Sequence, residues 1–271
     1  KNGMKGMAIT DHGVMFGIKE FSDYCAKINK ERKAKGEEPF KPIFGCEMYV
    51  ARRSMHDKEK DKHDNSGYHL IVLAKNYNGY KNLIKLVSHA WVDGYYYKPR
   101  TDREELEKYH EDLIVCSACI AGEVPNKIIR GDIEGAREAC EWYHRVFGDD
   151  YYLELQRHEV KAPTLVANRE AYPLQQKANK VLMQFAKEYG IKLVCTNDCH
   201  FEDKETAEAH DHLLCLSTNE DLDDPKRMRY SKQEWFKTRQ EMNEVFSDVP
   251  EAMANTLEIL DKIDSYSIDH G

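Results

Sequence analysis

The sequence passes from apolar residues to carboxylate, thiol and imidazole side chains within eight residues, in Leu193-Val194-Cys195-Thr196-Asn197-Asp198-Cys199-His200. Two other apolar runs end in the same way, in Ala8-Ile9-Thr10-Asp11-His12-Gly13 and in Ile43-Phe44-Gly45-Cys46-Glu47. A short hydrophobic run is typical of a buried parallel strand, and the residues just past the carboxyl ends of such strands line the functional face of α/β barrels. The three runs therefore predict an α/β fold with one shared metal site at that face.

Apolar runs alternate with amphipathic stretches over the first 200 residues. We expect strands at 6–10, 43–51, 69–74, 113–117, 151–155 and 193–196, and helices at 17–36, 77–91, 131–147 and 172–189. This alternation is typical of a parallel βα fold, and six strands favour a closed or nearly closed barrel over an open sheet.

The pattern after His200 is helical, without clear strands. We expect helices at 204–216, 233–246 and 250–263, with Ser231 and Glu234 forming a capping box for the second. We therefore divide the chain into a barrel, residues 1–200, and a helical extension, residues 201–271.

Between 52 and 67 lies a polar run of mixed charge, which predicts a mobile surface hairpin tip. For its two histidines, His56 and His63, an exposed position in a solvated loop is the favoured interpretation.

Composition limits the classes of function. The formal net charge is -8 and the pI about 5.9, which argues against this segment gripping a phosphate backbone by itself. No apolar run approaches the roughly 20 residues that cross a bilayer, and no secretory signal is recognisable at the amino end, so we expect a soluble, cytoplasmic protein without membrane contact.

The eight cysteines are scattered, and we interpret them as reduced. Cys116 and Cys119 have zinc-ribbon spacing, but no second pair completes a four-thiolate set, which disfavours a structural zinc ribbon.

Each candidate ligand also has an ordinary structural interpretation. Asp11-His12-Gly13 alone is more often a turn than a ligand, and a lone histidine such as His69 at a strand start is usually a satisfied core residue. For Glu47 a functional interpretation is favoured, because burying a carboxylate inside a strand costs free energy unless the carboxylate is paired or bound to a metal.

Asp198 and His200 give the sharpest local signal, because residues two apart lie on one side of an extended segment. Cys119 closes another strand and could add a thiolate, with burial without function an equal alternative. For His158, which follows the strand at 151–155, the structural interpretation is slightly favoured over a phosphate contact. A set of imidazole nitrogens and carboxylate oxygens suits zinc, manganese or iron better than calcium.

Five short motifs, in this order, resemble the polymerase and histidinol phosphatase (PHP) domain. They are Thr10-Asp11-His12-Gly13, Gly45-Cys46-Glu47, Tyr68-His69-Leu70-Ile71-Val72-Leu73-Ala74, Ser117-Ala118-Cys119 and Thr196-Asn197-Asp198-Cys199-His200-Phe201. Three more stretches are similar to the PHP branch at the amino end of bacterial replicative DNA polymerase III alpha subunits: Gly94-Tyr95-Tyr96-Tyr97-Lys98-Pro99-Arg100, Leu153-Glu154-Leu155-Gln156 and Pro250-Glu251-Ala252-Met253-Ala254-Asn255-Thr256.

The resemblance implies a distorted seven-stranded βα barrel, TIM-like, with a cluster of up to three divalent metal ions at its mouth. The resemblance implies six ligand positions: His12, Glu47, His69, Cys119, Asp198 and His200. It also implies that Glu47 bridges two metal ions, and that Asp11 helps to position the ligands without contacting a metal itself. The family's first motif, a His-x-His on the first strand, has no counterpart here, so we expect the first strand and helix to be missing and metal to bind incompletely. Zinc and manganese are favoured, with iron also open.

The family's chemistry implies metal-dependent phosphoester hydrolysis, as a possible 3′–5′ exonuclease activity beside a DNA polymerase centre outside these residues. The implied partners are DNA, the remaining polymerase domains and replisome subunits. Two alternatives stay open: a stand-alone phosphoesterase of histidinol-phosphatase type, and a catalytically silent scaffold within the polymerase.

Overall fold

The structure is a computed structural model and describes residues 2–160 and 170–268. Its strands are β1 (Gly6–Ile9), β2 (Lys41–Ala51), β3 (Gly67–Ala74), β4 (Arg100–Thr101), β5 (Leu113–Cys116), β6 (Tyr151–Leu155) and β7 (Lys192–Cys195). Its α-helices are α1 (Ile18–Ala34), α2 (Tyr77–Val92), α3 (Arg103–Lys108), α4 (Glu123–Arg130), α5 (Ile133–Phe147), α6 (Ala171–Tyr189), α7 (Ala207–Thr218), α8 (Arg239–Val245) and α9 (Pro250–Lys262). Single 3₁₀ turns are η1 (Lys60–Lys62), η2 (Gly148–Asp150) and η4 (Lys204–Thr206). All six strands expected from the apolar runs are present.

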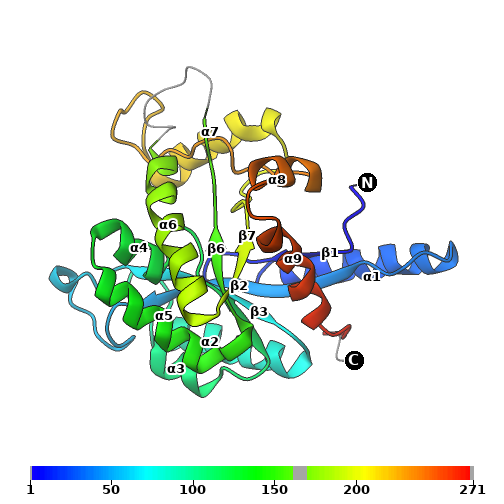
Figure 1. The fold of residues 1–271 in the computed structure, drawn as a ribbon, viewed down its shortest axis with the longest axis horizontal. Coiled ribbons are helices and arrows are strands. Elements are labelled where there is room, and N and C mark those ends of the chain that lie inside the picture. Colours follow the sequence, from blue (N-terminus) through cyan, green and yellow to red (C-terminus); the bar gives the residue numbers. More distant parts are fainter. Residues whose placement is uncertain (1, 161–169, 269–271) are drawn as a thin grey trace.

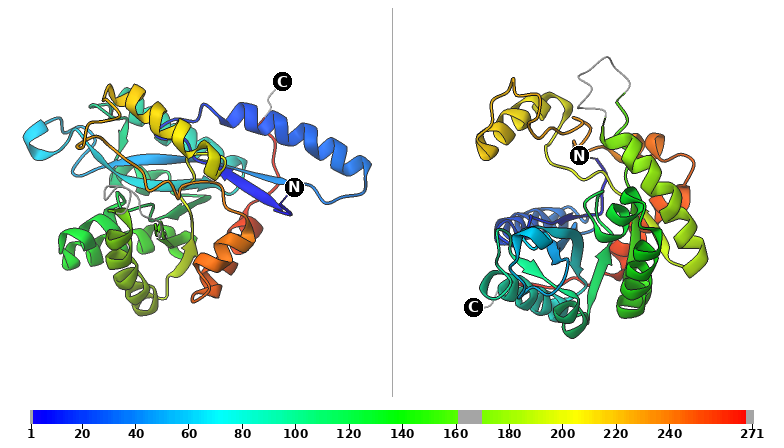
Figure 2. Two further views of the ribbon diagram at one scale, coloured as in Figure 1. Left: turned by 90° about the horizontal axis from the view of Figure 1, so that it is seen from above. Right: turned by 90° about the vertical axis from the view of Figure 1, so that its left-hand side faces the viewer.

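The strands form one seven-stranded mixed sheet in the order β1-β2-β3-β5-β6-β7, with the short β4 beside β2. The sheet curls into a half-barrel with helices on its outer side (Figures 1 and 2). This architecture confirms the α/β class and a partial barrel. The expectation of a closed or nearly closed barrel is wrong for the described strands, because β1 and β7 end the sheet without pairing with each other. We call the end at which β6 and β7 finish the mouth, and α7 lies beyond it (Figure 1).

One part of the predicted topology is wrong, because β3 runs antiparallel to both of its neighbours, β2 and β5. The physical reason is the connection before it: a loop of residues 52–66 joins β2 directly to β3, and a parallel neighbour would need a crossover helix there. The reversal places the start of β3, and therefore His69, at the mouth. The β1–β2, β5–β6 and β6–β7 pairs are parallel as expected.

Two apolar clusters hold the sheet. The larger lies between the strands and the outer helices and includes Cys46, Met48 and Val50 of β2, so Cys46 does point away from Glu47. The smaller fills the inside of the half-barrel, and it contains Ile259, Leu260 and Ile263 together with strand residues such as Ile43 and Tyr152. Hence α9 packs against the inside of the half-barrel at the end opposite the mouth, which we call the floor. The mouth is lined by polar residues instead. The division at residue 200 stays a prediction.

The polar run between β2 and β3 is fastened to the fold, which corrects the expectation of a mobile hairpin tip. Asp64 is fully buried and paired with Arg53. Arg100, also fully buried, donates to the backbone oxygens of Met55 at 2.8 Å and Asp57 at 3.0 Å. These bonds compensate for the lack of apolar residues in the run. His56 and His63 are exposed, as a solvated position requires.

The helix expected at 233–246 starts later, at Arg239. Thr238 and Glu241 form its capping box, whereas Ser231 and Glu234 hydrogen-bond each other within an irregular segment. Both pairs have the same sequence spacing, so the pattern alone could not separate them. Three short elements of two to eight residues, β4, α3 and α4, have no counterpart among the predicted elements. Among the described helices, none combines the length and apolar character needed to cross a bilayer.

Candidate metal centre

Three side chains from neighbouring strands converge at the mouth, and we call them the triad: His12, Glu47 and His69. His12 follows β1 and pairs with Glu47 of β2 in an isolated parallel bridge. His69 faces Tyr49 of β2 across the antiparallel pair, two residues from Glu47 and on the same side of the sheet. One ligand-type atom from each residue lies within 4.8 Å of the others.

The triad is joined through the Glu47 carboxylate. Its Oε1 lies 2.5 Å from His69 Nδ1 and its Oε2 lies 3.3 Å from His12 Nδ1. Glu47 is buried, whereas the His12 side chain is 43% exposed and faces the opening. The carboxylate can therefore use both oxygens toward two different partners.

Electrostatics favour the ionised form of Glu47 and the neutral form of His12, and these are the forms that bind metals. Burial would raise the pKa of Glu47, but the hydrogen bond from His69 and the charges of the nearby histidines lower it overall. Burial lowers the pKa of His12, helped by the charges of His69 and His200 and opposed by Glu47.

The other predicted residues lie around the same opening. Cys119 Sγ is 3.7 Å from His69 Nδ1. The His200 ring lies 5.7 Å from the His12 ring, and His200 Nδ1 lies 3.8 Å from Asp198 Oδ1. Burial raises the pKa of Asp198, and the Glu47 charge raises it further. Burial, followed by the charges of Asp198 and Glu47, raises the pKa of the Cys119 thiol. The six predicted ligand positions thus lie around one mouth, but among the described residues only the triad forms a group of three whose ligand-type atoms all lie within 4.8 Å of one another.

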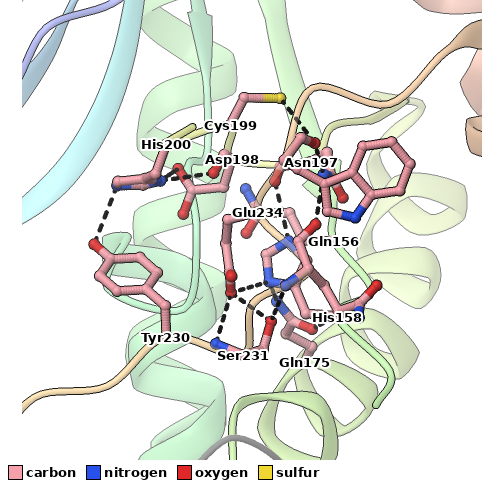
Figure 3. A network of polar contacts seen from close by, with 12 residues as sticks. Gln156, His158, Gln175, Asn197, Asp198, Cys199, His200, Tyr230, Ser231 and Glu234 are labelled. Carbon is pink, nitrogen blue, oxygen red and sulfur yellow. Dashed lines mark hydrogen bonds and ion pairs between the residues drawn. The ribbon is translucent and has the colours of Figure 1, made fainter. Parts of the chain in front are cut away.

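The tautomer of His200 places the lone pair of the ring on Nε2. His200 Nδ1 lies 2.7 Å from the backbone oxygen of Asp198, so the proton belongs on Nδ1 and the lone pair on Nε2. Tyr230 Oη lies 3.1 Å from that Nε2 and donates to it (Figure 3). Tyr230 was missed by sequence analysis, because it lies in an irregular segment without a local pattern.

Two contacts hold Tyr230 at this position. Arg227 forms a bidentate pair with Asp211 of α7, at 2.7 and 2.6 Å, which fastens the segment after the helix. Ser231 Oγ donates to Glu234 Oε1 at 2.6 Å and fixes the turn on the other side. The extension therefore contributes a side chain to the mouth of the barrel.

His158 lies in a separate buried network, which we define as His158, Gln175, Asn197, Ser231 and Glu234 (Figure 3). Gln175 Nε2 donates to Nδ1 of the ring at 2.9 Å, and Nε2 of the ring donates to the backbone oxygen of Asn197 at 3.0 Å. Burial lowers the pKa of His158, although Glu234 opposes this. Both ring nitrogens are bonded to buried protein groups, which favours the structural interpretation of His158.

Asp11 and Glu154 complete the surroundings. Asp11 Oδ2 accepts the backbone N–H of Gly17 at 2.9 Å, just before α1, and the Asp11 backbone oxygen accepts the N–H of Glu47 at 3.0 Å. Glu154 of β6 accepts from the backbone of Ala118 and, at 2.8 Å, from Thr196, and burial raises its pKa to about 7. Glu154 was not singled out as a site residue, although a carboxylate within an apolar strand is the signal that identified Glu47.

Comparison with known proteins gives a consistent result. A protein-family model described as PHP domain matches residues 1–158. Curated relatives named DNA polymerase III subunit alpha include those of Borreliella burgdorferi (40% identical, 99% of this chain, 22% of the relative), Thermus aquaticus (38%, 93% and 19%) and Treponema pallidum (37%, 95% and 20%). The chain thus spans about a fifth of the length of the relatives it matches.

Proposed function

The chain belongs to the PHP family, and we propose that its mouth is a divalent-metal centre for phosphoester hydrolysis within a replicative DNA polymerase III alpha subunit. The observation that carries the proposal is the convergence of the triad, with Glu47 between two imidazoles. In the full-length protein, the proposed partners are DNA, the other polymerase domains and replisome subunits, and the proposed compartment is the bacterial cytoplasm.

The donor set fits divalent metals. Nitrogen, carboxylate oxygen and a thiol together suit zinc or manganese, and Cys119 favours zinc. We propose that Glu47 bridges two ions and that the terminal ligands are His12, His69, Cys119, Asp198 and His200. Metal binding would also offset the buried charge of Asp198, whose pKa burial raises. Asp11 would act indirectly, since its backbone and side chain link the strand end of His12 to Glu47 and to the start of α1.

When bound, paired ions would lower the pKa of a water and neutralise charge on the phosphate. The protein's own residues prepare the site for this. The Asp198 carbonyl fixes the His200 ring, so that Nε2 keeps its lone pair toward the mouth. Tyr230 supplies a hydroxyl at that position, which can donate to an oxygen of substrate or water. Lys98, whose charge lowers the pKa of His12, provides a cation close to the anionic substrate.

The test compares metal content by elemental mass spectrometry, and hydrolysis of single-stranded DNA from its 3′ end, in the full-length protein and its Glu47→Gln variant. Glu105→Gln is a matched control, because Glu105 Oε2 lies 2.5 Å from His89 Nδ1 in a histidine–carboxylate pair on α2 and α3. We expect loss of metal and of hydrolysis only in Glu47→Gln. If the wild type binds metal but hydrolyses no DNA, the site is a structural metal site. If all three proteins contain equal amounts of metal, Glu47 is not a ligand.

A further inference from the structure

Three exposed aromatic residues lie next to the proposed metal centre, and we call them the aromatic strip: Trp91, Tyr95 and Tyr97. Trp91 is near the end of α2, and the two tyrosines lie in the loop that follows. Their side chains are 45%, 48% and 56% exposed. Large aromatic side chains grouped on a surface commonly mark a binding site, because water contact with so much apolar area is unfavourable.

The strip is attached to the segment that carries His12. Trp91 Nε1 donates to the backbone oxygen of Gly13 at 2.8 Å, one residue after His12. The Tyr49 ring stacks on His12, with ring centres 6.4 Å apart and planes at 20°. A Cβ at Gly13 would lie only 2.8 Å from the ring of Pro99 and 3.0 Å from Tyr49, so the loop packs closely against the strand end.

The loop is held rigidly, which favours binding without reordering. Arg100 is fully buried, donates to the backbone oxygen of Gly94 at 3.0 Å and lies 5.6 Å from the centre of the Tyr96 ring. The Tyr96 and Tyr97 rings meet edge to face at 4.9 Å. The exposed rings are therefore presented from a fixed backbone.

Two of the exposed rings already form a stack. Trp91 and Tyr95 have ring centres 5.4 Å apart and planes at 20°. A further flat ring can extend such a stack, and successive bases of single-stranded nucleic acid bind proteins in this way. A surface for a protein partner could equally be built from aliphatic side chains, whereas the stacked rings of Trp91 and Tyr95 are suited to bases.

The charge around the strip also fits a nucleic acid. The Lys98 ammonium lies 5.5 Å from the Tyr49 ring centre and has no ion-pair partner among residues 2–160 and 170–268. Lys60 Nζ lies 6.0 Å from the centre of the Tyr97 ring. Lys60 thus borders a ring of the strip, and Lys98, next to Tyr97 in the chain, borders Tyr49. The net charge of the protein is -8, so stacking must carry more of the binding than phosphate contacts do.

We propose that the aromatic strip stacks the bases of single-stranded DNA whose scissile phosphate lies in the metal centre. The inference rests on the proposed function and adds to it the residues that recognise the bases of the DNA strand. Because few cations contribute, binding should depend weakly on salt, with a log–log slope of about -0.7 for each phosphate contact that Lys98 or Lys60 makes.

The test replaces Tyr95 and Tyr97 together by leucine, which keeps apolar area but removes the rings, or by phenylalanine, which keeps the rings. Hydrolysis of a 3′-labelled oligonucleotide and of bis-p-nitrophenyl phosphate is measured in the full-length protein, with Glu47→Gln as background. In the leucine variant, KM for the oligonucleotide should rise about tenfold. The ratio of kcat/KM for the oligonucleotide to kcat/KM for the small ester should fall by the same factor. The phenylalanine variant should match the wild type. Tyr24→Leu on α1 is the control, since Tyr24 is 61% exposed.

A second measurement separates this inference from the proposed function. An oligonucleotide with 5-iodouracil near its 3′ end is irradiated with the wild-type protein, and the crosslinked peptides are mapped by mass spectrometry. Crosslinks at the strip support base stacking even if no hydrolysis occurs, in which case only the hydrolytic function fails. An unchanged KM in the leucine variant, or crosslinks found only elsewhere, would overturn the proposal and leave the strip to a protein partner.

Discussion

The triad and the buried network contain the same kinds of side chain, but they are held in opposite ways. In the network, both nitrogens of His158 are bonded to an amide and a backbone group. In the triad, the contacts described for the Glu47 carboxylate are those with His12 and His69, which are ligand types themselves. A polar residue whose partners are all structural stabilises the fold, whereas one whose partners are other ligands remains available to a metal.

The largest expected effect comes from removing the centre of the triad. Glu47→Ala in the full-length protein should abolish metal binding and hydrolysis, because it removes the carboxylate that we propose to bridge the ions. Stability of the metal-free protein should change little, since the partners left behind face the opening. Elemental analysis and chemical denaturation in chelator measure the two quantities. A large loss of stability with metal retained would place Glu47 with the network instead.

Glu154 tests a carboxylate that is bonded within the protein. Its pKa, raised to about 7 from an ordinary 4.5, means that the folded state holds the proton more tightly than the unfolded state. The stabilisation present below about pH 4.5 is therefore lost as pH rises through 7. Between these pH values the wild type should lose about 3 kcal/mol relative to Glu154→Gln. Denaturation in chelator at several pH values checks this, and parallel pH curves for the two proteins would contradict it.

His158→Ala should affect stability and leave metal binding intact. The change leaves the buried Gln175 amide and Asn197 carbonyl without their hydrogen-bond partner, which should lower the free energy of unfolding by roughly 1–3 kcal/mol. Urea denaturation measures the loss, and metal content is measured in parallel. His63→Ala, on the exposed loop, is the control. If His158→Ala emptied the metal site, the separation between the two regions would be wrong.

Tyr230→Phe should give the smallest effect. The hydroxyl donates to His200 Nε2 in this structure, so a metal must replace that hydrogen bond. Without it, metal affinity should rise a few-fold, the equivalent of about 1 kcal/mol. Competition with a chelator of known affinity measures the change. Weaker binding in Tyr230→Phe would show that the tyrosine supports the loaded site rather than competing for it.

The local elements could be predicted because each depends on a local pattern. The apolar runs specified six of the seven strands. The polar residues just past two of these runs marked His12 and Asp198, and a carboxylate inside a third marked Glu47. The Ser231 and Thr238 capping boxes have identical spacing, and only packing after α7 decides that a helix follows Thr238. Short elements such as β4 and α3 have too few residues for a period to be visible.

The sequence by itself determined the fold class, the strands and the set of ligand-type residues, because burial of apolar runs and the cost of buried charge act locally. The tertiary structure decided which of those residues meet. Reversal of β3 brings His69 to the mouth, where a parallel strand would have carried its first residues to the floor. The irregular segment after α7 delivers Tyr230 to His200, and the network encloses His158 instead of exposing it. These outcomes depend on contacts between residues far apart in the chain, which no local pattern records.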